Sequence, residues 1–499
     1  MCPSVCLVTM HETWNTPMLL SCDNDVYSAI PMASKMLSRE KKSSEGAMEP
    51  EVTFLCKRTV VSNMAVRPGT YHHLSVLDRA MDQLGSVRAV YYYPRFPSAG
   101  GAWSTTGRLR ESLAEVLTSY PAATGRLQRG AEGGWVVKCN DAGVRMVEAR
   151  AKGSVQEWLQ KVDREREMKL IFWEDIYDRP YFWSTFYVQL TEFEGGGLAI
   201  GMSCSHMLAD ATCLTMLVKA WAEMTLLGKM LSPPCFHPLP TTTPSDTSSH
   251  RRPYTDLIEH YRSSMEAENL GINPPRFNTA TFAFSDEAVR SIVAESTAAD
   301  DAAPTPFQAL AALFWASITR VTGRKRGLID MTICVDTREA LNLSKSFFGN
   351  AMVFNGTQGG EIEEGRLDMA VKAIADVMKE MGHEGVLDLI EWLEAHSEAT
   401  GPRRMLYGPR LLCANWEGLR PYQATFEPGV RPIQVSYYLE PVLGEGQILV
   451  LPSSQGNEGS LSRTVMVTLP EDQLGMLCEE AHVLRYHPKI LLGPNKTHA

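Results

Sequence analysis

The stretch from Gly197 to Gly228, GLAIGMSCSHMLADATCLTMLVKAWAEMTLLG, decides the fold prediction for this chain. We expect a strand over Leu198–Ser205, a tight turn that carries His206, and then a helix that ends at Gly228, a residue type common just beyond helix C-termini. Asp210 falls at the start of this helix, where a carboxylate accepts hydrogen bonds from free backbone N–H groups and faces the positive end of the dipole. Apolar residues recur at helical spacing: Leu214, Leu217, Val218, Trp221 and Met224.

His206 and Asp210 form an HxxxD pattern at this strand-to-helix junction. Such a junction lets a ring project from a rigid scaffold while a carboxylate four residues later holds the turn in shape. The HxxxD spacing alone is weak evidence for a catalytic residue, because a chain with 12 histidines can contain it by chance. The alternative interpretation is a histidine that only packs at the entrance of a helix. The position of the pair within a clear strand, turn and helix favours His206 as a candidate general base.

Composition limits the classes of protein that the chain can represent. With 499 residues, of which 44% are hydrophobic and 21% charged, it is ordinary globular material and long enough for two domains. The formal net charge of −10 disfavours nucleic acid as a partner. The 11 cysteines lack CxxC spacing, which indicates free thiols in a reducing compartment. Without an apolar run of about 18 residues or a signal-peptide pattern, we expect a soluble, cytosolic protein with no transmembrane segment.

The coarse class is α/β with two comparable lobes, and a sizeable substrate is expected between them. Residues 1–50 include the polar run Ser38–Glu45 and are predicted to be a mobile N-terminal extension. Residues 51–228 form the predicted N-terminal lobe with HxxxD, and residues 276–499 the C-terminal lobe. The intervening residues 229–275 contain a Pro-, Ser- and Thr-rich stretch and are predicted to be the linker.

Periodicity and capping signals predict the remaining elements. Helices are expected at about Thr106–Ser119, Ser154–Val162, Asp286–Ser296, Pro306–Val321, Arg366–Met381, Gly385–Ala395 and Pro470–Val483. Strands are expected at Val90–Tyr93, Gly134–Asn140, Val144–Glu148, Phe182–Glu192, Phe277–Phe284, Leu328–Val335, Ala351–Phe354, Pro432–Leu439, Gln447–Leu451 and Arg463–Leu469. The chain contains no GxSxG elbow, Walker loop or HExxH pair, and nothing indicates a metal.

Several further segments resemble the BAHD acyltransferase family. They are LRESLAEVLTSYPAATGRLQ at 109–128, CNDAGVRMVEA at 139–149, Asp336-Thr-Arg338, and Phe348-Gly-Asn350. With HxxxD they run in the expected order from about Val52 to Leu492. The resemblance implies two chloramphenicol-acetyltransferase-like lobes, each a mixed sheet with flanking helices, joined by a long crossover loop around a solvent channel. It also implies a monomer of plant specialised metabolism with no permanently bound cofactor, with acyl-CoA as co-substrate and a small-molecule alcohol or amine as acceptor.

The mechanism that the resemblance implies suits the residue chemistry. His206, as a neutral imidazole, would take the proton of the acceptor as its oxygen attacks the thioester carbonyl. The oxyanion then needs a hydrogen-bond donor, and the indole N–H of Trp416 is the candidate. Asp210 would be structural, pointing away from the substrate. Acyl transfer by His206, of a hydroxycinnamoyl or fatty acyl group, is thus the predicted function.

The chain departs from the family pattern at its DFGWG motif. The aligned residues are Thr425, Phe426, Glu427, Pro428 and Gly429. The family aspartate pairs with a distant arginine, for which Arg338 is the candidate structural arginine. That arginine therefore lacks its partner unless Glu427 substitutes. Ala211 also replaces the glycine that normally follows HxxxD.

These departures resemble the eceriferum/glossy wax branch of the family, as do HMLADA, EWL at 157–159, and residues 414–452. That branch implies an alternative function: a non-catalytic accessory protein of very-long-chain fatty acid elongation in cuticular wax synthesis. Its partner would be a condensing enzyme of the elongase, and its place peripheral to the endoplasmic reticulum. The retained DTR and FFGN segments are similar to catalytic members instead. A peptide-synthetase condensation domain is disfavoured, because Ser205 replaces the first histidine of HHxxxDG.

Overall fold

The stretch that carries HxxxD folds as the sequence predicts. In the computed structural model, β8 (Leu198–Ser205) leads through a turn into α5 (Ala211–Leu227), with Asp210 as the N-cap residue. The helix ends at Gly228, which adopts φ 68° and donates its N–H to the carbonyl oxygen of Met224. This left-handed conformation is the one that glycine adopts without steric cost, so the residue type and the helix end agree.

The structure describes most of the chain from residue 50 onward. The described residues are 50–81, 85–96, 105–130, 134–174, 181, 183–240, 256–266, 275–298, 302–363, 365–396, 406, 410–456 and 459–493. The extension predicted over residues 1–50 lies outside them, apart from Pro50. Within these ranges, no helix combines the length and the apolar character needed to cross a bilayer.

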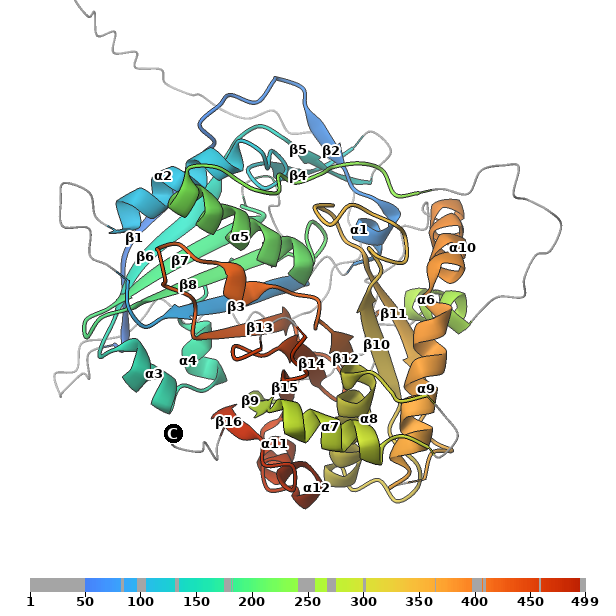
Figure 1. Cartoon of the computed structure of the whole chain (residues 1–499). Coiled ribbons are helices and arrows are strands. Elements are labelled where there is room, and N and C mark those ends of the chain that lie inside the picture. Colours follow the sequence, from blue (N-terminus) through green and yellow to red (C-terminus); the bar gives the residue numbers. More distant parts are fainter. Residues whose placement is uncertain are drawn as a thin grey trace, which may run out of the picture. The chain divides into compact units, whose positions relative to one another are not determined.

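The first of two large sheets has six strands in the order β1-β6-β7-β8-β3-β13. Their bounds are β1 Val52–Val60, β3 Ser86–Tyr93, β6 Val144–Ala151, β7 Phe186–Phe193, β8 as above and β13 Gln434–Glu440. Only the β6–β7 pair is parallel. Figure 1 shows α2 (Thr105–Leu117) and α5 packed together over this sheet. The indole of Trp221 on α5 donates to the carbonyl oxygen of Leu109 on α2 at 2.9 Å.

Strand β13 comes from the C-terminal part of the chain but pairs with β3 in the first sheet (Figure 1). The buried carboxylate of Glu167, on α4 (Arg164–Met168), bridges these two strands. It accepts hydrogen bonds from Tyr92 on β3 at 2.8 Å and from Ser436 on β13 at 2.9 Å, and a further one from Tyr438. Residues beyond the predicted linker therefore complete the sheet that the N-terminal lobe begins.

The second sheet has seven strands in the order β11-β10-β12-β14-β15-β9-β16. Their bounds are β9 Phe277–Phe284, β10 Met331–Asp336, β11 Met352–Thr357, β12 Leu411–Asn415, β14 Gln447–Pro452, β15 Arg463–Pro470 and β16 Lys489–Leu492. A small third sheet contains β2 Tyr71–His73, β5 Trp135–Lys138 and β4 Arg126–Arg129. Both large sheets are mixed, so the fold is α/β with two sheet-and-helix units.

The remaining helices follow the predicted pattern in part. They are α1 Val76–Ala80, α3 Val155–Lys161, α6 Asp256–Glu266, α7 Asp286–Glu295, α8 Pro306–Val321, α9 Leu367–Glu380, α10 His383–Ala395, α11 Glu471–Leu477 and α12 Ala481–Leu484, with a 3-10 turn at Pro421–Gln423. The single helix predicted over Pro470–Val483 is wrong, because the chain breaks into α11 and α12, and Glu480 caps the second. Helix α6 falls within the residues predicted as linker.

Candidate active site

His206 directly follows β8, and backbone hydrogen bonds fix its place. Its N–H donates to the carbonyl oxygen of Gly85 at 2.9 Å, while Leu208 and Ala209 donate to the carbonyl oxygen of Ser205 at 3.0 and 3.2 Å. Only 2% of the residue surface is exposed. This burial disfavours the charged imidazolium and lowers the pKa of His206 to about 4. The ring is therefore neutral at pH 7.

Asp210 points into the protein interior and is fully buried. Its Oδ1 accepts the backbone N–H of Cys213 at 2.9 Å, which caps α5, and its Oδ2 accepts the N–H of Ala351 at 3.0 Å. The Nη2 of Arg338 donates to both oxygens, at 3.1 and 3.0 Å. Every one of these contacts holds the shape of the turn, so the geometry gives the carboxylate a structural task.

Arg338 is held by two carboxylates and the FGN segment. Its Nη1 donates to Asp336 Oδ2 at 2.8 Å and its Nη2 to the carbonyl oxygen of Gly349 at 2.7 Å, in addition to Asp210. Burial by itself would lower the pKa of the guanidinium, but the surrounding groups, Asp210 first among them and then Cys213 and Asp336, together outweigh it, and the pKa lies above its ordinary value. The pair joins residues 128 positions apart, from the two sides of the predicted linker.

The sequence left open whether Glu427 substitutes as the partner of Arg338; it does not, because each residue has another partner. Glu427 forms an ion pair with Arg108 on α2, while Arg338 pairs with Asp210. The neighbouring Phe426 is fully buried and packs edge-on against Trp221, with ring centroids 5.0 Å apart. Within the segment Thr425–Gly429, Phe426 therefore packs against Trp221 of α5 and Glu427 pairs with α2, whereas Arg338 reaches the N-terminus of α5.

Trp416 directly follows β12 and is 3% exposed. Its ring packs edge-on against Tyr437 at a centroid distance of 5.9 Å, and the Tyr437 hydroxyl lies 2.7 Å from the hydroxyl of Thr215 on α5. Among the described residues, the indole Nε1 is a buried donor with no hydrogen-bond partner. Leaving such a donor unpaired costs free energy, so the indole N–H is a candidate to donate a hydrogen bond to a bound molecule.

Two residues that the sequence did not mark as part of the site support its backbone, Asn350 directly and Asp78 through Asn350. Asn350 donates from its side-chain amide to the carbonyl oxygen of His206 at 2.8 Å and to Asp78 Oδ1 at 2.8 Å. Asn350 belongs to the FGN segment, which the sequence identifies as a motif, but the sequence does not predict its hydrogen bond to His206. Asp78 is the third residue of α1, and the spacing Ser75-x-x-Asp78 is a capping box, a signal for a helix start but not for a site.

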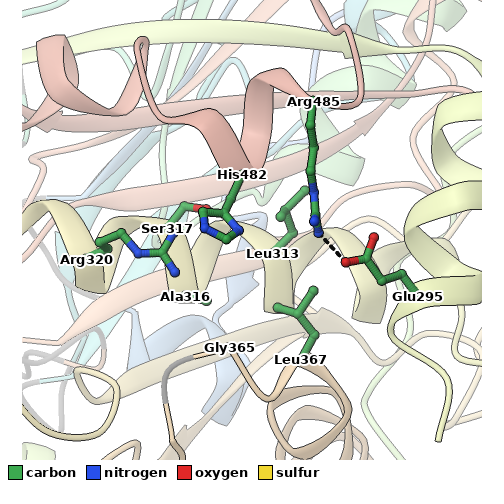
Figure 2. A pocket seen from close by; sticks show the side chains of 9 residues that line it. All are labelled: Glu295, Leu313, Ala316, Ser317, Arg320, Gly365, Leu367, His482 and Arg485. Atoms are coloured by element: carbon green, nitrogen blue, oxygen red, sulfur yellow. Dashed lines mark hydrogen bonds and ion pairs between the residues drawn. The ribbon is translucent and has the colours of Figure 1, made fainter.

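A pocket of about 410 Å³ lies elsewhere, between α7, α8 and the C-terminal helices (Figure 2). It is lined by Glu295, Leu313, Ala316, Ser317, Arg320, Gly365, Leu367, His482 and Arg485. Arg485 pairs with Glu295 across it, and Arg320 pairs with Glu480 at 2.9 Å. None of the predicted site residues lines this pocket. Over the described ranges, no three His, Cys, Asp or Glu side chains are grouped to hold a metal ion.

Two solved structures share the fold of this chain. Vinorine synthase superposes with a TM-score of 0.62 at 18% identity, over 86% of this chain and 98% of that one. F. sporotrichioides TRI101, complexed with coenzyme A and T-2, gives a TM-score of 0.63 at 14% identity, over 85% of this chain and 100% of that one. The predicted α/β class with two sheet-and-helix units is therefore confirmed.

The sequence then identifies the family. Residues 51–484 match the model described as Transferase family. The chain belongs to this family, the BAHD acyltransferases, and the resemblance seen in its motifs is confirmed.

Relatives of this chain include both an eceriferum protein and proteins named as transferases or synthases, the two groups between which the sequence did not decide. Protein ECERIFERUM 26 of Arabidopsis thaliana is 26% identical, over 87% of this chain and 96% of its own length. Rosmarinate synthase of Plectranthus scutellarioides is 25% identical, over 80% and 93%. Omega-hydroxypalmitate O-feruloyl transferase of Arabidopsis thaliana is 26% identical, over 66% and 72%.

Proposed function

We propose that the chain transfers an acyl group from acyl-CoA to a hydroxyl or amine acceptor, with His206 as the general base. The observation that carries this proposal is the clamp on Asp210. Three groups engage the carboxylate, namely Arg338, Cys213 N–H and Ala351 N–H, so it shapes the turn while His206 supplies the titratable group. Membership in an acyltransferase family supports the same division of roles.

The proposed reaction follows from the chemistry of a neutral, buried imidazole. The ring accepts the acceptor proton as the oxygen or nitrogen bonds to the thioester carbonyl carbon, and a tetrahedral oxyanion forms. The unpaired indole N–H of Trp416 is our candidate donor to that oxyanion. Collapse then breaks the carbon–sulfur bond, and the thiolate of CoA receives the proton from the imidazolium. Limited exposure of His206 protects the thioester from water during these steps.

The acyl group is proposed to be hydroxycinnamoyl or fatty acyl. The name of one relative, omega-hydroxypalmitate O-feruloyl transferase, supports a hydroxycinnamoyl donor and a hydroxyl on a fatty chain as acceptor. A cytosolic monomer, built from lobes at 51–228 and 276–499 around the linker at 229–275, remains part of the proposal. The elongase-accessory function is kept as an outcome of the test below.

The test compares two buried histidines in the purified full chain. Feruloyl-CoA and a long-chain fatty acyl-CoA are each offered with a panel of alcohols and amines, and the product is quantified by chromatography, since the 11 cysteines would react with a thiol reagent. We expect His206→Gln to lower kcat by about 10²–10⁴-fold through loss of the base. The matched control is His260→Gln, because His260 is 7% exposed and burial also lowers its pKa to about 4. It is expected to keep kcat within about threefold, as it lies outside the HxxxD turn.

Equal activity of both variants would contradict the role of His206. If no donor and acceptor pair gives product, while the chain still promotes fatty acid elongation in cells with or without His206, the accessory function replaces transfer.

A further inference from the structure

We propose that Asp78 and Asn350 position the imidazole of His206 through its backbone carbonyl, an inference that rests on the proposed function of His206. Neither residue offers itself as an acid or base to a substrate here. Asn350 acts on the ring through a hydrogen bond to the main chain of the HxxxD turn, and Asp78 acts through Asn350, so we class both as positioning residues.

The contacts form a continuous relay between distant parts of the sequence. Asp78 Oδ1 accepts both the backbone N–H and the side-chain amide of Asn350, each at 2.8 Å, across 272 residues of sequence. The same amide group donates its second hydrogen to the carbonyl oxygen of His206 at 2.8 Å, across 144 residues. Asp78 is 3% exposed, His206 2% and Asn350 fully buried. Water therefore competes little for these bonds, which makes each of them stronger and more directional than at the surface.

The orientation of the Asn350 amide is fixed by the charges around it. Rotating the amide by half a turn would place its oxygen against the Asp78 carboxylate and the His206 carbonyl, which are both acceptors. In the observed orientation, Asn350 Oδ1 is buried and has no hydrogen-bond partner among the described residues. An unpaired buried acceptor costs free energy. The orientation that leaves Oδ1 unpaired is the one that lets the side-chain N–H groups donate to Asp78 and to the carbonyl oxygen of His206.

The next residue in the chain holds the other end of the same turn. Ala351 donates its N–H to Asp210 Oδ2 at 3.0 Å, so consecutive residues hold the carbonyl of His206 and the carboxylate of Asp210. Removing the Asn350 amide would free only the end that carries the ring. A displacement of about 1 Å at a reacting group can lower a rate about 10²-fold, which is the upper end of the effect expected here.

The first experiment compares two buried asparagines of the same chain region. Asn350→Ala is expected to lower kcat by about 10–100-fold and to change KM by less than about threefold, because the loss is in alignment rather than binding. Asn355→Ala is the matched control. Asn355 is fully buried on β11, but it donates to Glu380 at 3.2 Å, away from the turn. We expect it to lower Tm and leave kcat unchanged.

The second experiment tests whether Asp78 acts through Asn350. Asp78→Asn alone is expected to lower kcat by about tenfold, because one of its oxygens becomes a donor group and the hold on Asn350 weakens. In the Asn350→Ala background the same change is expected to have no further effect on kcat, because the effects of substitutions at two residues of one relay do not add. A full additional loss in the double variant would show that Asp78 acts independently and would overturn the relay.

Hydrogen exchange supplies a readout that needs no activity. Amides of residues 206–214 are expected to exchange faster in Asn350→Ala than in Asn355→Ala, as the turn is released in the first only. Unchanged exchange together with unchanged kcat in Asn350→Ala would overturn the positioning role. If the wild-type chain shows no His206-dependent transfer, the proposed function fails instead, and exchange still decides whether Asn350 holds the turn.

Discussion

Asp78 and Asp210 are two buried carboxylates that hold neighbouring residues of one segment, Asn350 and Ala351, but their charges are balanced differently. Asp210 faces the guanidinium of Arg338. Asp78 instead accepts hydrogen bonds from uncharged donors, the N–H of Ser75 at 2.8 Å and the two N–H groups of Asn350. Burial raises the pKa of Asp78 above its usual range, although these hydrogen bonds oppose the rise.

The different partners of Asp210 and Asp78 separate two effects of a buried carboxylate, its contribution to the stability of the fold and its control of where a partner residue lies. A buried ion pair stabilises the fold mainly in the sense that removing one partner leaves the other charge uncompensated. A carboxylate held by uncharged N–H donors leaves no opposite charge behind when it is replaced, and each of its hydrogen bonds is directional, so it determines where its partner lies. We therefore expect Asp210 to matter most for folding and Asp78 for alignment of the turn.

Replacing Asp210 by asparagine, with the same change at Asp78 for comparison, is expected to change the free energy of unfolding more than the other tests of this comparison do. Asp210→Asn should lower the free energy of unfolding by about 3–5 kcal/mol, because Arg338 keeps a buried charge that only the partly exposed Asp336 still faces. Asp78→Asn should cost about 1–2 kcal/mol, because its partners are uncharged N–H groups and no opposite charge is left unpaired. Urea unfolding of both variants measures the two values. Equal losses would show that the arginine does not distinguish the two sites.

Acid should destabilise the fold through its buried histidines. Burial lowers the pKa of His206 and of His260 to about 4, below the value of about 6.5 in an unfolded chain. Between these values the unfolded state binds more protons, so the free energy of unfolding falls as the pH falls from 6.5 towards 4, by at most about 3 kcal/mol for each ring. Urea unfolding at pH 5 and pH 7 measures this loss.

Two variants sharpen the pH experiment. His260→Gln should make the loss smaller by removing one of the two groups. Asp78→Asn should make it larger, because a carboxyl with a raised pKa favours the folded state at low pH and so opposes the histidines. Stability that is independent of pH between 5 and 7 would contradict the buried, neutral state of both rings.

Local signals in the sequence predicted the elements that present the site. Strand β8 and helix α8 have the predicted bounds, and α5 begins at its predicted cap, because capping residues, glycine and apolar spacing act within a few residues of one another. The capping box of Thr305 and Gln308 at the start of α8 is such a signal. These features depend only on residues close in the chain.

Contacts between distant segments could not be predicted in this way. Strand β13 has the pattern of a buried strand, but nothing in that pattern says that it pairs with β3 of the first sheet. Alignment with the family offers Glu427 as a substitute partner for Arg338, but in the structure Glu427 pairs with Arg108 on α2. Asn350 and Asp78 lie 272 residues apart, so periodicity carries no information about their contact.

The smallest effect separates the two tasks of Asp78, which closes the capping box of α1 and also holds Asn350. Ser75→Ala removes the hydroxyl that accepts the Asp78 N–H at 3.1 Å, but leaves the Ser75 N–H and both bonds from Asn350 in place. We expect a loss of about 1 kcal/mol in unfolding free energy and no change in kcat. Ser154→Ala, in the exposed capping box of α3, should cost about the same and serves as the control. If Ser75→Ala instead slows transfer as much as Asp78→Asn does, then the start of α1, and not the amide of Asn350, sets the position of the turn.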